Sequence, residues 1–185
     1  LPRAVQPTLN RLAAQTQESF SVVVLDGDEI VIIGRSGFEW KSPADGKTAP
    51  ARVLAYGLHL GARLPAHATS TGRVLLAGQT KTAVNAWLKA KTPAGNLARL
   101  TLHTVTDTRK LRALVDQTRI DDYCLASEEH ELGVHALAVP LRDMQGHTVA
   151  SLNVVSSPQR VAPAVMRREF LPLLLDAARE LRPLL

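Results

Sequence analysis

The residue types that could carry out chemistry are concentrated between positions 124 and 135. Cys124 is followed by an acidic, histidine-bearing stretch, residues 127–131, and then by His135. A cysteine near a histidine can act as a nucleophile with its base, and clustered histidine and carboxylate side chains can hold a metal ion. The spacing of these residues decides whether either chemistry is possible.

That spacing argues against both. Cys124 lies in an apolar, strand-like stretch, where a buried structural thiol is the common case. The possible metal ligands lie at a loop–strand junction, where alternating side chains point to opposite faces, and no phosphate-binding or nucleophile-elbow motif is present. We therefore predict no catalytic residue, no metal and no cofactor. The alternative from another class is a hydrolase or metal-dependent enzyme that uses Cys124, His67, His130 and His135.

Two further features of the chain suggest recognition of an anion. Residues 61–77 contain Thr69, Ser70 and Thr71 immediately before an apolar helical run, and such a helix start either caps the helix or binds an anion. His135 either faces inward and donates a hydrogen bond to a ligand carboxylate, or is an ordinary half-exposed strand residue.

The acidic stretch at 127–131 is either a solvated turn, or it turns Glu128 or Glu129 inward to accept backbone N–H groups beneath a pocket.

Two hairpins and several helices would position these residues. Residues 20–25 and 29–34 flank Asp26-Gly27, which is typical of a tight hairpin, and their near-continuous apolar character indicates that both sheet faces are covered. A polar turn at 142–147 separates a second pair of apolar strands, residues 134–141 and 148–155. Other expectations are a loop at 36–50 with Phe38 and Trp40 as a lid or a core plug, a strand at 52–59, a turn at 92–96, and helices at 3–18, 80–91, 107–120 and 161–185.

The order of these elements does not alternate strand with helix, so it predicts an α+β fold with an antiparallel sheet. Pro172 is expected to kink the last helix or to start a new one.

The 185 residues, 45% of them hydrophobic, fit one domain without a membrane span or a signal peptide. A single cysteine suits the cytoplasm. The net charge of +5 favours an anionic partner, but the cations are too scattered for direct nucleic-acid binding.

Four segments, in order, resemble the effector-binding domain of IclR-type bacterial transcription regulators. They are residues 25–30, 61–77, 123–143 and 150–154, and they are most similar to the subgroup that controls protocatechuate, 4-hydroxybenzoate and β-ketoadipate metabolism. The resemblance implies that residues 1–185 form a GAF-like domain, with a curved antiparallel sheet of about six strands and helices on one side. It also implies a small organic or aromatic acid as effector, and a homodimer or a dimer of dimers. The chain starts as if cut, so DNA would be bound only through a winged helix-turn-helix domain that precedes it.

The resemblance also assigns a pocket. One wall would be Ser70, Thr71 and Gly72, and the facing residues would be Ala126 or Ser127, Val134, Ala136, Asn153 and Val155, with His135 beside them. The pairs 134, 136 and 153, 155 each share a strand face because side chains alternate with period two. Relatives often have an acidic residue near 126–127 and, in this subgroup, arginine at the position of His135. A third possibility remains, namely an oligomerisation module whose pocket is filled by its own side chains.

Overall fold

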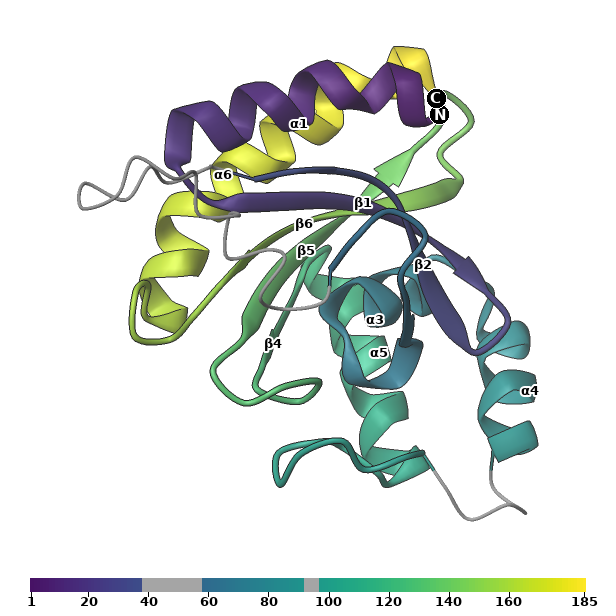
Figure 1. The fold of residues 1–185 in the computed structure, drawn as a ribbon. Coiled ribbons are helices and arrows are strands. Elements are labelled where there is room, and N and C mark those ends of the chain that lie inside the picture. Colours follow the sequence, from purple (N-terminus) through teal and green to yellow (C-terminus); the bar gives the residue numbers. More distant parts are fainter. Residues whose placement is uncertain (38–57, 92–96) are drawn as a thin grey trace.

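The computed structural model describes residues 1–37, 58–91 and 97–185 (Figure 1). Phe38, Trp40, most of the predicted 36–50 loop and 52–59 strand, and the predicted 92–96 turn therefore lie outside the described residues. The elements are α1 (Pro2–Thr16), β1 (Ser19–Asp26), β2 (Glu29–Ser36), β3 (Arg63–Pro65), η1 (Ala66–Ala68), α3 (Ser70–Ala77), α4 (Lys81–Lys91), α5 (Thr108–Asp121), β4 (Cys124–Ser127), β5 (His135–Arg142), β6 (Thr148–Ser156), α6 (Pro163–Leu181) and η2 (Arg182–Leu184).

The strands form one six-stranded antiparallel sheet in the order β3-β2-β1-β6-β5-β4. Both predicted hairpins are present, and Gly27 has the positive φ, 63°, that the first tight turn requires. Strands β1 and β6 pair in the middle of the sheet, so segments more than a hundred residues apart become neighbours. The predicted α+β fold with a curved six-stranded sheet is confirmed.

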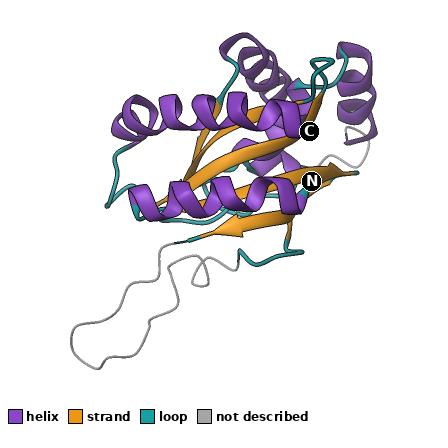
Figure 2. Cartoon of the chain, turned by 90° about the horizontal axis from the view of Figure 1, so that it is seen from above, coloured by secondary structure: helices purple, strands orange, loops and turns teal. Residues whose placement is uncertain are grey.

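Helices cover both faces of this sheet, which corrects the expectation of helices on one side only. Helices α1 and α6 lie side by side across one face, whereas α3 lies against the other face and α5 packs on α3 (Figures 1 and 2). The alternation along β5 explains the two layers. Leu137 and Val139 pack into the core beneath α1 and α6, while Ala138 packs on the opposite side against Val74 of α3.

Helix α6 runs without interruption through Pro172, so the prediction that a new helix starts there is wrong. Pro172 is exposed, and water can therefore satisfy the carbonyl group of Arg168 that a proline nitrogen cannot bond. Among the described residues, no helix is long and apolar enough to cross a lipid bilayer.

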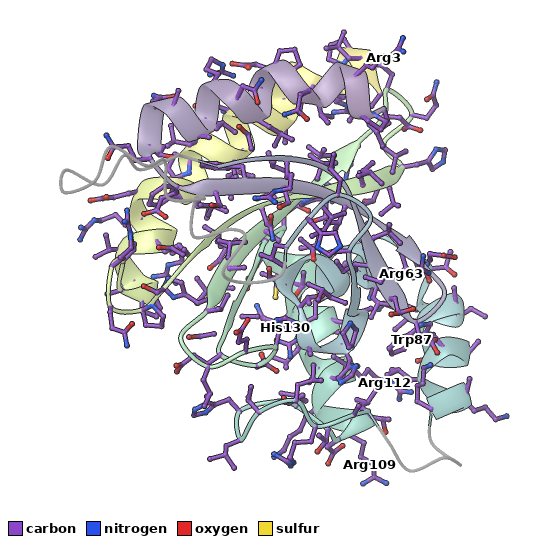
Figure 3. All side chains as sticks on the ribbon, in the orientation of Figure 1. Arg3, Arg63, Trp87, Arg109, Arg112 and His130 are labelled. Atoms are coloured by element: carbon purple, nitrogen blue, oxygen red, sulfur yellow. The ribbon has the colours of Figure 1, made fainter. Side chains whose placement is uncertain are left out.

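Helix α4 is attached to the turn between β1 and β2. The indole Nε1 of Trp87 donates a hydrogen bond to the carbonyl oxygen of Gly27 at 3.1 Å, and Lys91 forms an ion pair with Asp28 (Figure 3). Arg63 of β3 forms ion pairs on the same hairpin. These contacts hold the far end of the β1–β2 hairpin in place beside η1 and α3.

Candidate functional site

A cavity of about 530 Å³, including its open mouth, lies between the sheet and the start of α3. Its sheet side is mostly apolar and comes from β1, β2, β3, β4, β5 and β6. Its other side comes from η1, the first turn of α3 and the loop that joins β4 to β5, on which Figure 3 shows His130. This volume includes open solvent at the mouth, so the space enclosed among the side chains is smaller.

The cavity brings together most of the residues that the sequence assigns to a pocket. Those that line it are Ser70, Thr71, Ala126, Val134, His135, Ala136, Asn153 and Val155. Gly72 and Ser127 are not among the lining residues. Ser127 follows Ala126 on β4, and alternation turns it to the opposite face of the sheet. Of the two residues, Ala126 is therefore the one whose side chain lines the cavity.

Gly72 has a packing role. A Cβ atom at this position would lie 2.0 Å from the carbonyl oxygen of Ala66 and 2.5 Å from its Cα atom. Only glycine therefore lets α3 approach η1 this closely. The contact sets where the first turn of α3 lies over the sheet, so Gly72 shapes the cavity without lining it.

A Gly72→Ala variant is expected to be destabilised by about 3 kcal/mol, at the upper end of the usual cost of overpacking. The obstructing atoms are backbone atoms of η1, so relief requires moving α3 or η1, and the better helix propensity of alanine recovers only about 1 kcal/mol. Urea denaturation followed by circular dichroism measures the change. An unchanged unfolding midpoint would contradict the packing role.

The start of α3 offers hydrogen-bond donors to the cavity. Thr69 caps the helix, because its Oγ1 accepts the N–H of Gly72 at 3.1 Å and its carbonyl accepts the N–H of Arg73. The backbone N–H groups of Ser70 and Thr71 have no acceptor within the helix, as is general for a first turn. The Ser70 Oγ atom is buried and has no hydrogen-bond partner in the described part of the chain. These are the donors, together with the helix dipole, that a helix start can offer to an anion.

The sheet supplies polar groups on the other side of the cavity. Asn153 of β6 is 8% exposed, and its Oδ1 atom is buried without a partner in the residues that the structure covers. Ser21 of β1 lies directly opposite Asn153 in the ladder and also lines the cavity. The surrounding lining is apolar and includes Val23, Ile32 and Val155. The cavity therefore combines an apolar slot with polar groups on two walls.

His135 borders the cavity at the first position of β5. It is 1% exposed, and neither ring nitrogen has a partner within the described ranges. In the ladder it pairs with Ser127 and Ser156, so alternation places it on their side of the sheet although it borders the cavity. Burial lowers its pKa, and the charge of Glu128 only partly offsets this. The imidazole is therefore neutral at pH 7, and a bound anion would gain no full positive charge from it.

Acidification is expected to destabilise the domain through its buried histidines. Burial lowers the pKa of His67 and His135 below the usual 6.5, so the unfolded chain takes up protons first as the pH falls. Their contribution is complete above pH 6.5 and is lost as the pH falls from there towards the folded-state pKa values, by at most about 1.4 kcal/mol per pH unit for each histidine. Chemical denaturation between pH 7.5 and 5.5 measures this slope, and a His135→Gln variant should show a smaller one. A stability independent of pH over this range would contradict the prediction.

The acidic loop adopts the inward alternative, in which Glu128 and Glu129 accept backbone N–H groups, and it also has an arginine partner that was not expected. Glu128 Oε1 accepts the N–H of Gly133 at 2.9 Å, and Glu129 Oε1 accepts the N–H of Val105 at 3.1 Å. Glu129 also lines the cavity and forms an ion pair with Arg73, at 2.5 Å between Nη2 and Oε1. Burial opposes the charge of Arg73, but Glu129 outweighs it and raises the guanidinium pKa. An arginine inside the apolar run 73–76 was the signal in the sequence for a buried acidic partner.

The residues of the alternative enzyme are not brought together. Cys124 packs against Val74 and Ala138 and does not line the cavity, and burial raises the pKa of its thiol. His67 is occupied by a contact between Nε2 and the carbonyl oxygen of Ala98 at 2.8 Å. No group of three or more metal-ligating side chains is found in residues 1–37, 58–91 and 97–185.

Comparison with known proteins agrees with this geometry. The family model "Bacterial transcriptional regulator IclR C-terminal" matches residues 1–182. The p-hydroxybenzoate hydroxylase transcriptional activator of Acinetobacter baylyi is 45% identical over 184 residues, and the Pca operon regulatory protein of the same organism is 44% identical over 185. Each comparison covers 100% of this chain, which spans 64% and 62% of the two relatives.

A solved structure is similar over the same range. It is a double mutant of the PobR inducer-binding domain from Acinetobacter in complex with 3-hydroxybenzoic acid. It has a TM-score of 0.85 and 45% identity, and it covers 100% of this chain and 99% of its own. The C-terminal domain of Escherichia coli KdgR matches with a TM-score of 0.77 and 27% identity, over 97% and 94% of the two chains. These relatives are transcription regulators, in agreement with the prediction that the chain is not an enzyme. The chain belongs to the IclR family of bacterial transcriptional regulators and corresponds to its C-terminal region.

Proposed function

We propose that this domain senses a small aromatic carboxylic acid and transmits its binding to a DNA-binding domain in the same protein. The observation that carries the proposal is the cavity itself, because buried polar atoms without described partners, Ser70 Oγ and Asn153 Oδ1, occur among its lining residues. Buried polar groups are rarely left unsatisfied, so a ligand that bonds to them is expected. The PobR inducer-binding domain, 45% identical, supports the choice of an aromatic acid, because its structure contains 3-hydroxybenzoic acid.

The cavity suits such an acid in a particular orientation. The carboxylate would lie at the start of α3 and accept hydrogen bonds from the N–H groups of Ser70 and Thr71 and from the Ser70 hydroxyl. The ring would lie among apolar side chains such as Val23 and Val155. Asn153 would bond to a polar substituent or to the edge of the carboxylate. Thr71, Ala126, Val134, His135 and Ala136 would complete the contact surface.

The wider biology of the domain is part of the same proposal. Residues 1–185 would form one GAF-like effector-binding domain of a cytoplasmic regulator, preceded by a winged helix-turn-helix domain and assembled as a homodimer or a dimer of dimers. By thermodynamic linkage, the effector would change the affinity for the operator by the same factor as the operator changes the affinity for the effector. The family membership and the names of the two most similar relatives reported above support this role.

Isothermal titration calorimetry on this domain tests the proposal. The panel would contain 3-hydroxybenzoate, 4-hydroxybenzoate, protocatechuate and an aliphatic keto acid, with benzyl alcohol as a ligand that lacks the carboxylate. At least one aromatic acid is expected to bind with one-to-one stoichiometry and to raise the melting temperature. A folded domain that binds none of these acids would count against the proposed function.

A further inference from the structure

The charge balance around the cavity raises a problem for an anionic ligand. Among the lining residues that the structure describes, Glu129 is acidic and there is no lysine or arginine. His130 and His135 also line the cavity, but burial lowers the pKa of both, so they contribute no charge at pH 7. A lining with one uncompensated carboxylate would repel a second carboxylate inside a medium of low dielectric constant.

Arg73 lies behind the lining and supplies the missing positive charge. Its side chain is 2% exposed, that of Glu129 is 10% exposed, and Nη2 and Oε1 are 2.5 Å apart. Arg73 follows Ser70 by three residues on α3, and residues with this spacing are neighbours on a helix surface. The guanidinium charge therefore lies close to the helix start as well as to Glu129.

The pair is not saturated by hydrogen bonds. The Arg73 Nε atom is buried and has no partner in the described part of the chain. On the carboxylate, both hydrogen bonds made by described groups, from Arg73 and from the Val105 N–H, reach the same oxygen, Oε1. Each partner therefore keeps hydrogen-bonding capacity that no described group fills.

We propose that Arg73 is the counter-charge that lets this cavity accept an anion, and that Glu129 sets its preference between a carboxylic acid and the matching neutral amide. Arg73 acts through its pairing with Glu129 and does not line the cavity. This inference rests on the proposed function, because it concerns the charge of the ligand at the same site. It assigns a role in selectivity to an ion pair that would otherwise be only structural.

The direction of the effect follows from the sign of the charges. A Glu129→Gln variant keeps the shape and keeps an oxygen that can accept from Arg73 and from Val105, but it leaves the positive charge of Arg73 uncompensated. The affinity for an anion should rise, and that for a neutral molecule of the same shape should not. With partly buried charges at an effective dielectric constant near 20, the ratio of the two affinities should change by about tenfold or more.

The test is calorimetric titration of 3-hydroxybenzoate and 3-hydroxybenzamide into four proteins at neutral pH. The proteins are the wild type, Glu129→Gln, the double variant Arg73→Gln/Glu129→Gln, and Glu131→Gln. Glu131 is an exposed glutamate of the same loop, and its substitution removes the same charge at a matched position. The measured quantity is the Kd of the amide divided by the Kd of the acid. Circular dichroism and thermal melting establish that each variant is folded.

The ratio is expected to rise about tenfold in Glu129→Gln, to stay unchanged in Glu131→Gln, and to return towards the wild-type value in the double variant. A folded Glu129→Gln protein with an unchanged ratio, or with both affinities reduced equally, overturns the inference and leaves the pair a structural role only. If the wild type binds the amide but not the acid, the proposed function fails, whereas the inference predicts that Glu129→Gln gains acid binding. Binding of neither compound by any of the four proteins contradicts both.

Discussion

A Ser70→Trp variant is expected to bind aromatic acids at least about 100-fold more weakly than the wild type, a loss of about 2.7 kcal/mol or more. Ser70 is 1% exposed and lines the cavity at the first position of α3. An indole there would occupy the volume that a ring needs and would cover the N–H groups of the helix start. Because Ser70 is buried, the variant is informative only if thermal melting shows that it is folded.

A Ser70→Ala variant is the control for this effect. It removes only the hydroxyl group, and the loss of one hydrogen bond is expected to weaken binding by about tenfold or less. Titration with 3-hydroxybenzoate and thermal melting of both variants separate blockage from unfolding. Unaltered binding by a folded Ser70→Trp protein would remove the assignment of the site to this cavity.

An Arg73→Met variant is expected to lose about 3–5 kcal/mol of unfolding free energy, the usual consequence of removing one partner of a buried ion pair. The substitution leaves Glu129 in the interior with only the N–H of Val105 among its described side-chain contacts. The unpaired carboxylate of Glu129 should then turn towards water, which would break its bond with the N–H of Val105 in the segment before α5. Urea denaturation measures the loss.

The double variant Arg73→Met/Glu129→Leu tests whether the stability lost in Arg73→Met comes from the unpaired carboxylate of Glu129. Well-packed apolar replacements of a buried ion pair are often neutral or even stabilising, so much of the lost stability should return. A matched exposed pair provides the reference, namely Arg179 with Asp176 on α6. Removing Arg179 should cost no more than about 1 kcal/mol. Equal losses for Arg73→Met and Arg179→Met would show that burial does not amplify the Arg73 interaction.

The local elements could be predicted from the sequence because their signals lie in short windows. Asp26-Gly27 between two apolar runs gave the first hairpin, and the 107–120 helix was placed within one residue of α5 (Thr108–Asp121). Asp107 caps that helix by accepting the N–H groups of Arg109 and Lys110. Of the two expectations for Pro172, a new helix is excluded because α6 continues through it. Its exposed position lets water reach the carbonyl group that the proline nitrogen cannot bond.

Only period-two alternation and the family resemblance allowed residues of the candidate site to be predicted from the sequence. They placed Ser70, Ala136, Asn153 and Val155 around one cavity, whose role in binding stays a prediction. Ser21 and the other lining residues of β1 and β2 were missed. No local signal shows that β1 pairs with β6, and this pairing is what places Ser21 opposite Asn153.

The sequence by itself determined the two hairpins, the longer helices and the start of α3. Only the tertiary structure decided that Arg73 meets Glu129, 56 residues away, that Gly72 is fixed by η1, and that helices cover both faces of the sheet. The physical reason is the distance along the chain over which each kind of interaction acts. Backbone preferences and capping act over a few residues, whereas the pairing of distant charges depends on the order of strands in the sheet and on the path of the chain across it.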